Sequence, residues 1–218
     1  SDYFDHRNDG VWEFYAAGNL SWLGAYSGDF QPIEDSEVMV VSLGGYFETQ
    51  LARTEDEGIT WELVTHGSSD EHLNLFISFH NEDPNLVYAG NKISYDAGNT
   101  FSQVDFGEFN QYTPQILAMC QSNPDIIYAL DDPGRYRIFR SDDRGQNWYI
   151  YSDYEQGVRH GRLDRLPTFA IDPIGCDKVY GLVDYDLAVY DGTDWRKTGV
   201  LDLAGYSSTS ELGNYVRS

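Results

Sequence analysis

The chain has 218 residues and carries 36 acidic against 14 basic side chains, which gives a formal net charge of −22. A protein this acidic repels phosphate backbones and anionic lipid headgroups, so we expect no nucleic-acid partner. No stretch approaches the ~20 apolar residues that a membrane-spanning helix requires, so we expect no membrane insertion. Hydrophobic residues make up 41% of the chain, which is enough to bury a core.

The first 35 residues contain no recognisable repeat, although residues 11–26 are rich in aromatic side chains. We predict that residues 1–35 supply N-terminal strands, either as a partial repeat unit or as a closing clasp. Four units of similar organisation follow, and a C-terminal extension ends the chain. We place the units at 36–70, 71–110, 111–155 and 156–205, and the extension at 206–218.

Each unit is predicted to contain four β-strands. The first is an apolar run, at 75–79, 116–120 and 169–171, and it ends at a turn with Asp83-Pro84, Asn123-Pro124 or Asp172-Pro173. The second is rich in β-branched residues and tyrosine, at 87–90, 127–130 and 179–182. The fourth is expected at 62–65, 102–105, 149–152 and 196–200. No helical periodicity is sustained, so we predict an all-β fold.

A short motif, which we call the box turn, follows the third strand of each unit. Three copies read Ser/Thr-x-Asp-x-Gly-x-Thr/Asn-aromatic, and the fourth is worn. Their defining residues are Thr54, Asp56, Gly58 and Trp61; Ser94, Asp96, Gly98 and Phe101; Ser141, Asp143, Gly145 and Trp148; and, in the worn copy, Asp191 and Trp195. Hydroxyl and carboxylate side chains close such a turn, glycine accepts a positive φ, and the ring packs on a neighbouring sheet. We therefore interpret these residues as structural.

The spacing of the box turns indicates a repeat architecture. The four box aspartates are separated by 40, 47 and 48 residues, which is the length of a four-stranded propeller blade. The proline turns repeat in the same phase.

These boxes resemble the Asp-box, or bacterial neuraminidase repeat, of sialidases, xyloglucanase-type glycoside hydrolases, sortilin-type receptors and a photosystem assembly factor. The resemblance covers about residues 36–200 and implies a β-propeller of four-stranded blades. At this blade length the chain holds four to five blades, as a small ring or as part of a larger one. The resemblance implies no single function, because these families share blades and differ in their active sites. The sialidase signature Arg-Ile-Pro reads Arg137-Ile138-Phe139 here, which argues against sialidase activity.

The xyloglucanase-type enzymes resemble this chain most, since residues 83–90 match one of their phrases. That resemblance places a catalytic aspartate before the box strand, at Asp131 or Asp132 in one blade and at Asp184 or Asp186 in the next. Asp132 and Asp186 are the candidates for the acid or base. Glycoside hydrolysis needs two carboxylates, and these enzymes carry them on separate large propellers, which this chain is too short to hold. The Gly-Gly of the family pattern is also missing.

Ligand binding is predicted at loops of the third unit. The candidates are Asp131, Arg135, Tyr136, Arg137, Tyr112 and Tyr154. Arginine side chains in such a loop can grip a polar ligand through bidentate contacts, and loop tyrosines can stack on sugar rings. The alternatives are a solvated hairpin whose charges neutralise each other and aromatic rings that fill the space between sheets.

The two cysteines, Cys120 and Cys176, lie 56 residues apart, which is not metal-ligand spacing. We favour buried thiols, with one long-range disulfide as the alternative. The five histidines show no zinc-binding spacing, and nucleotide-binding fingerprints are missing, so we expect no metal and no cofactor.

Our leading interpretation is a non-catalytic β-propeller module from an extracellular, cell-surface or virion-surface protein. It would recognise a polysaccharide, a glycan or a protein, or assemble with further blades of the same parent chain or another subunit. The alternative is a xyloglucanase-like glycoside hydrolase acting on a neutral β-glucan, or part of one.

Overall fold

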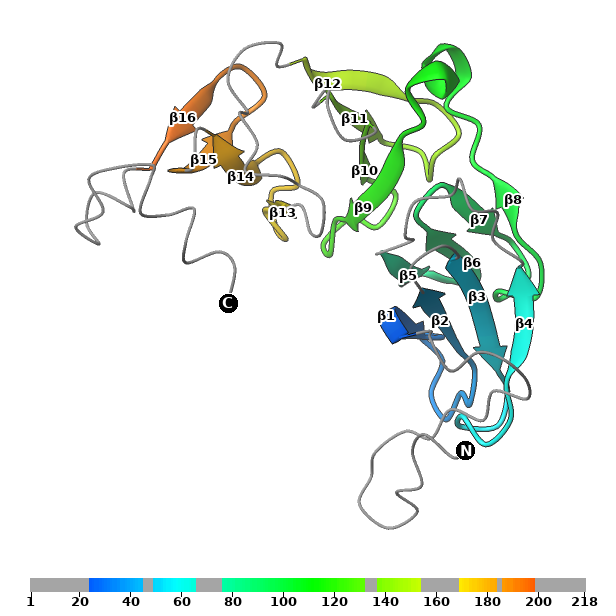
Figure 1. Cartoon of the computed structure of the whole chain (residues 1–218). Coiled ribbons are helices and arrows are strands. Elements are labelled where there is room, and N and C mark those ends of the chain that lie inside the picture. The colour runs from blue at the N-terminus through cyan, green and yellow to red at the C-terminus, as the bar shows by residue number, and fades with distance from the viewer. Residues whose placement is uncertain are drawn as a thin grey trace. The chain divides into compact units, whose positions relative to one another are not determined.

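A computed structural model describes residues 24–44, 49–65, 76–131, 137–153, 169–183 and 186–198 (Figure 1). These residues form four antiparallel sheets of four strands each, and in every sheet consecutive strands are neighbours. This confirms the predicted all-β, propeller-like fold. The part of the chain that the structure describes contains no helix that is long and apolar enough to cross a membrane.

The chain divides into two compact units, residues 1–104 and 105–218. The first unit holds β1 (Gly24–Phe30), β2 (Met39–Gly44), β3 (Thr49–Thr54) and β4 (Glu62–Thr65), then β5 (Ile77–His80), β6 (Asp83–Ala89), β7 (Lys92–Ser94) and β8 (Ser102–Gln103). The second unit holds η1 (Gly107–Tyr112), β9 (Gln115–Met119), β10 (Ile127–Leu130), β11 (Arg137–Ser141) and β12 (Tyr149–Asp153), then β13 (Phe169–Ile171), β14 (Val179–Val183), β15 (Asp186–Tyr190) and β16 (Trp195–Lys197).

Strand β1 lies within the segment 1–35 and pairs with β2 as the first strand of the first sheet. Most of the aromatic-rich stretch 11–26 lies outside the described residues. The strand predictions fit well elsewhere: β4, β10 and β13 have the predicted bounds, and the other predicted runs overlap a strand.

The prediction that Asp83-Pro84 forms a turn was wrong, because both residues belong to strand β6. Proline has no N–H to donate, but the ladder is irregular here, since the register shifts between Phe79 and His80. The carbonyl oxygen of Pro84 accepts a hydrogen bond from Gln31 Nε2 at 3.0 Å, which ties β6 to the first sheet.

The 3-10 helix η1 was not predicted. Asp105 organises its start: Oδ1 accepts hydrogen bonds from the Gly107 N–H at 2.9 Å and from Asn110 Nδ2 at 2.8 Å. These bonds, that of Asn110 first, lower the pKa of Asp105. A 3-10 helix of six residues leaves no sustained periodicity in the sequence, so only flanking polar residues such as Asp105 could have signalled it.

Apolar side chains fill the space between the sheets of each unit. In the first unit the shared core consists of Val40, Leu51, Ile77, Phe79, Val87, Ala89 and Ala97. In the second unit it consists of Cys120, Ile126, Tyr128, Ile138, Cys176, Val179 and Tyr190. Each core draws on two sheets, so the sheets of a unit depend on each other for stability.

The three complete box turns share one hydrogen-bond pattern. In the first, Thr54 Oγ1 donates to Asp56 Oδ1 at 2.7 Å and accepts the Gly58 N–H at 2.9 Å. Asp56 also accepts the Thr60 N–H and hydroxyl at 2.8 and 2.6 Å. The bonds from Thr60 and then Thr54 lower the pKa of Asp56. The glycine of each box has positive φ, as does the residue before it.

The worn fourth box is held differently. Asp191 accepts only longer bonds from the Thr193 and Asp194 N–H groups, at 3.2 and 3.3 Å. Trp61 and Trp148 donate to their own box glycines, at 2.9 and 3.0 Å. The Trp195 indole instead donates to Ser152 Oγ in the third sheet, at 3.1 Å. The last box residue therefore joins two sheets.

Candidate functional site at the loop end of the third sheet

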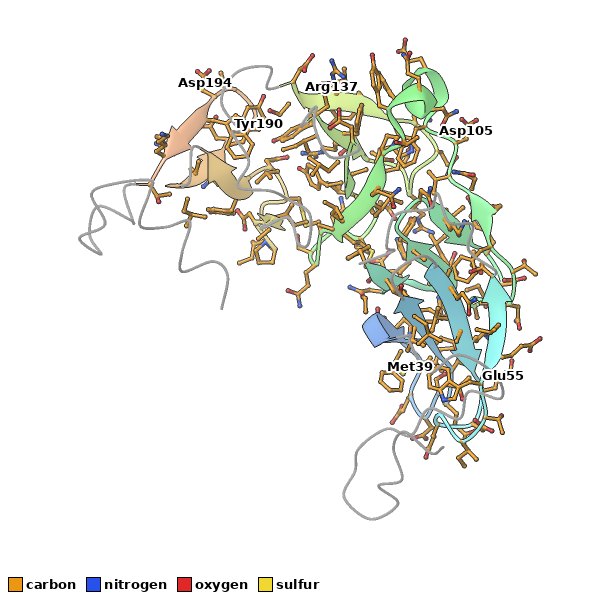
Figure 2. All side chains as sticks on the ribbon, viewed as in Figure 1. Met39, Glu55, Asp105, Arg137, Tyr190 and Asp194 are labelled. Carbon is orange, nitrogen blue, oxygen red and sulfur yellow. A yellow bond between two sulfur atoms is a disulfide. The ribbon has the colours of Figure 1, made fainter. Side chains whose placement is uncertain are left out.

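The predicted ligand-binding residues that the structure describes lie at one end of the third sheet, where β10 ends and β11 begins. Asp131 follows β10, Arg137 opens β11 and Tyr112 ends η1 shortly before β9 (Figure 2). The box turn lies at the other end of β11. Arg135, Tyr136, Tyr154 and the catalytic candidate Asp132 lie outside the described residues, and the side chain of Asp186, the first residue of β15, is also not described.

Asp131 and Arg137 close the base of the loop between β10 and β11. The Asp131 carboxylate accepts the Arg137 N–H at 2.9 Å, and the Asp131 N–H donates to the Arg137 carbonyl at 3.2 Å. Arg137 Nη1 also lies 3.7 Å from Asp131 Oδ2. Because the Asp131 side chain is only 1% exposed, its carboxylate is buried at this end of the sheet.

The Arg137 guanidinium is fixed on two further sides. Its Nε lies 3.2 Å from Asp153 Oδ1, and its central carbon lies 4.5 Å from the centroid of the Tyr112 ring. The Tyr112 ring also stacks on Phe139, at 6.3 Å between centroids. Of the three charged side chains, Asp153 is the most accessible, at 44% against 15% for Arg137. A ligand would therefore meet a guanidinium of fixed position with a carboxylate at its edge.

Sequence reasoning missed Asp153 in this cluster. Asp153 faces Arg137 directly in the β11–β12 ladder, so the pairing register was the signal. The register shifts between Ile138 and Phe139, which a strand alignment without the structure does not locate.

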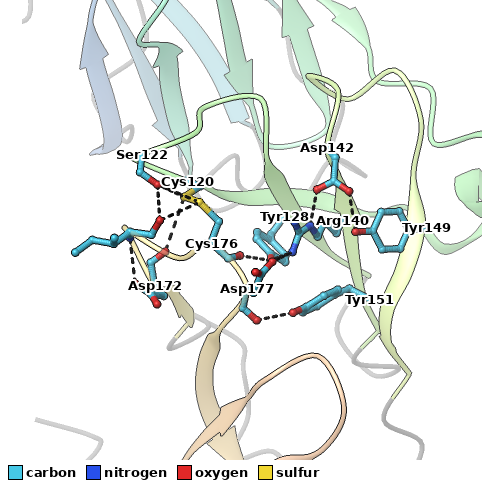
Figure 3. A network of polar contacts seen from close by, with 11 residues as sticks. Cys120, Ser122, Tyr128, Arg140, Asp142, Tyr149, Tyr151, Asp172, Cys176 and Asp177 are labelled. Carbon is cyan, nitrogen blue, oxygen red and sulfur yellow. Dashed lines mark hydrogen bonds and ion pairs between the residues drawn. A yellow bond between two sulfur atoms is a disulfide. The ribbon is translucent and has the colours of Figure 1, made fainter.

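A second polar cluster joins the third and fourth sheets around Arg140 (Figure 3). Arg140 Nε donates to Asp142 at 2.6 Å, and Nη1 donates to Asp177 at 2.6 Å and to the Tyr128 hydroxyl at 3.0 Å. The guanidinium also lies over the rings of Tyr128 and Tyr151. We refer to Arg140 with these four partners as the Arg140 clamp. It joins residues 37 positions apart.

Burial sets the ionisation of this cluster. It raises the pKa of Tyr128, with partial opposition from the charge of Arg140. Burial and the bond to Asp142 raise the pKa of Tyr149 to about 12. Burial opposes the charge of Arg140, but the hydrogen bonds that Arg140 donates to Asp177 and Asp142 outweigh it and raise the pKa of Arg140. The tyrosines are therefore neutral donors at physiological pH.

The prediction that the two cysteines are free thiols was wrong, although the prediction that they are buried was right. Cys120 and Cys176 are buried, but they form a disulfide with a Cα–Cα distance of 5.6 Å. Cys120 follows β9 in the third sheet, and Cys176 lies in the turn between β13 and β14. The packing of these two sheets brings the residues together, and their sequence spacing alone does not reveal it.

The fold and these clusters define a β-propeller-like repeat protein. No protein-family model and no curated protein sequence matches the chain. Similar solved structures include a GH74 enzyme of Niastella koreensis, with 12% identity over 80% of this chain and 30% of that one and a TM-score of 0.53. The GH74 xyloglucanase of Xanthomonas campestris is similar at 13% identity over 80% of this chain and 30% of that one, with a TM-score of 0.57. YCF48 bound to a D1 peptide is similar at 19% identity over 80% of this chain and 52% of that one, with a TM-score of 0.52.

At these identities the similarity shows the fold alone. The chain spans between 30% and 52% of the length of these three structures. Their activities therefore do not transfer to this chain with the fold.

Proposed function

We propose that the chain is a non-catalytic β-propeller module of the Asp-box type, which recognises a neutral polysaccharide or a protein segment at the loop end of its third sheet. The observation that carries this proposal is the mutual engagement of Asp131, Arg137, Asp153 and Tyr112. Their charges and rings fix one another, which is what a rigid recognition surface requires.

The class of partner follows from charge. With a net charge of −22, the chain repels polyanions at long range, whereas a neutral or basic ligand meets no such barrier. The structural neighbours are compatible with both partner classes, since one is a xyloglucanase and another is bound to a peptide.

The Cys120–Cys176 disulfide supports an extracellular, cell-surface or virion-surface location. Disulfides form and persist mainly in oxidising compartments. Within this proposal, further blades come from the same parent chain or from another subunit.

The second candidate is a glycoside hydrolase acting on a neutral β-glucan, or part of one. The fold shared with GH74 enzymes favours it, and Asp132 directly follows the buried Asp131. In this alternative Asp132 or Asp186 is the acid or base, and the release of reducing ends depends on that carboxyl group.

The recognition proposal is tested by the affinity of the full chain for xyloglucan and for a panel of uncharged peptides, measured by titration calorimetry. Arg137→Met removes the guanidinium and keeps most of the stem, so we expect at least a tenfold loss of affinity for whichever ligand binds. Arg144→Met is the matched control, because Arg144 pairs with Asp125 at the box end of the same sheet. Unchanged binding by Arg137→Met, or an equal loss in both variants, would contradict the proposed site.

A further inference from the structure

The disulfide connects the third sheet to the turn between the first two strands of the fourth sheet. This turn, residues 172–178, lies between β13 and β14. Its backbone closes on itself through the Asp172 N–H, which donates to the Lys178 carbonyl at 2.8 Å. Cys176 has a φ of 62° in it.

The turn is also docked by noncovalent bonds from the third sheet (Figure 3). All five donors belong to strands of the third sheet or to the turn between its strands β9 and β10, and all five acceptors belong to the docked turn. They are Ser122 N to the Pro173 carbonyl at 3.0 Å, Ser122 Oγ to the Ile174 carbonyl at 2.7 Å, the Tyr128 hydroxyl to the Cys176 carbonyl at 2.5 Å, the Tyr151 hydroxyl to the Asp177 carbonyl at 2.5 Å and Arg140 Nη1 to the Asp177 carboxylate at 2.6 Å. These bonds place Cys176 beside Cys120 whether or not the sulfurs are joined.

The first unit contains the same attachment without a covalent bond. Gln31 occupies the position after β1 that Cys120 occupies after β9. The Gln31 N–H donates to the Val38 carbonyl at 3.0 Å, and the Cys120 N–H donates to the Ile126 carbonyl at 2.9 Å. Gln31 Nε2 then reaches the carbonyl of Pro84 in the next sheet. A hydrogen bond therefore joins two sheets at the place where the second unit has a disulfide.

The fourth sheet is also the one with the worn box turn. Its Asp191 accepts two long backbone bonds, whereas Asp56 also accepts the Thr54 and Thr60 hydroxyls. The covalent attachment thus belongs to the sheet whose own box turn is least well held.

We propose that the Cys120–Cys176 disulfide is a redox-sensitive latch on the fourth sheet. It closes over a turn that is already docked, so reduction leaves the sheet folded but lets it open locally from the third sheet. Both cysteines are at most 3% exposed, so a dithiol reaches the disulfide when the turn moves transiently away from the third sheet. In the reduction, a thiolate of the dithiol attacks one sulfur, and the other leaves as a thiolate. The second thiol then closes the reductant into a cyclic disulfide, so two cysteine thiols form as one dithiol is oxidised.

The expected effect is large and local. In the chain-entropy model, a disulfide that closes a fully unfolded loop of 56 residues changes the equilibrium by roughly a thousandfold. Because the third sheet lies within this loop and stays folded, that factor is an upper limit for the local opening. Amide protection in β14 and β15 should fall by up to about that factor on reduction. Protection in β10, β11 and the first unit should stay within about threefold, because the latch does not touch their ladders.

The test is hydrogen exchange of the full chain, followed by mass spectrometry, with and without dithiothreitol. The double variant Cys120→Ala/Cys176→Ala is the control, and it should match the reduced protein whether or not dithiothreitol is present. Reoxidation with glutathione disulfide should restore protection in the wild type alone.

Three results would overturn the latch. Equal loss of protection in β10 and β11 would make the disulfide a general staple of the second unit. No loss anywhere would show that the noncovalent bonds suffice. Complete loss of protection in the fourth sheet of the reduced wild type would show that the sheet cannot fold without the disulfide.

Discussion

Replacing Arg140 with methionine tests whether the Arg140 clamp holds two sheets together. The substitution keeps an apolar stem of similar length and removes the guanidinium. The Arg140 side chain is 10% exposed, whereas Asp142 and Asp177 are 50% and 68% exposed, so water screens both ion pairs. We assign them about 0.5 to 1 kcal/mol each. The Tyr128 hydroxyl bond adds about 1 kcal/mol, and the two ring contacts about 0.5 kcal/mol each.

These contributions add up to an expected cost of about 3 to 4 kcal/mol, which lowers the melting temperature by on the order of 10 to 20 °C for a unit of this size. The Tyr128 hydroxyl is not orphaned, because it still donates to the Cys176 carbonyl. Urea unfolding followed by tryptophan fluorescence measures the change.

Arg53→Met is the matched control in the first unit. Arg53 occupies the equivalent position before a box turn, but it bonds only the Ala97 carbonyl and the exposed Glu55. We expect about 1.5 kcal/mol for this variant. A cost below about 1 kcal/mol for Arg140→Met, or equal costs in the two variants, would refute the assignment of Arg140 as an inter-sheet clamp.

Two further predictions concern the box turns. For Asp96 and Asp143, burial raises the pKa, but hydrogen bonds outweigh it, and for Asp56 hydrogen bonds dominate, so all three have lowered pKa values. The stabilisation that these carboxylates provide is present above the unfolded pKa of about 3.9 and is lost as pH falls through the folded pKa values. The melting temperature should therefore stay constant from about pH 7 to 5 and decline below about pH 4. A melting temperature that stays constant down to about pH 2 would contradict this. Gly98→Ala should cost about 3 kcal/mol or more in urea unfolding, because a Cβ at φ +83° would lie 2.5 Å from Val40 Cγ2. Gly107→Ala, at φ +61° with nothing within 4 Å, should cost only about 1 to 2 kcal/mol, and equal costs would show that the close contact is unimportant.

Local chemistry explains how much of the fold was predictable. The side-chain hydrogen bonds within the first box turn, such as those of Thr54 to Asp56 and Gly58, span at most four residues, so a short motif contains most of the turn. One bond leaves it, because the Glu57 N–H donates to the Glu37 carbonyl at 3.3 Å. The strands followed from apolar and β-branched runs between these turns. The proline at position 84 misled the prediction because its contact with Gln31 lies 53 residues away.

The polar clusters were less predictable because their partners come from different strands and sheets. Asp131 and Arg137 flank one hairpin loop, so the sequence alone places them near each other, and their role in ligand binding stays a prediction. Asp177 lies 37 residues from Arg140 and Cys176 lies 56 residues from Cys120, so only the packing of two sheets brings them together. One sequence contains no signal for that packing beyond the repeat itself.

We propose that the chain recognises its ligand without turnover. To test this, the full chain is incubated with xyloglucan under binding conditions, and bound polysaccharide and new reducing ends are measured in the same samples. We expect binding that is weakened by Arg137→Met, with reducing ends at the level of a protein-free control. Reducing-end release that is lost in Asp132→Asn or in Asp186→Asn would refute recognition without turnover and establish the hydrolase.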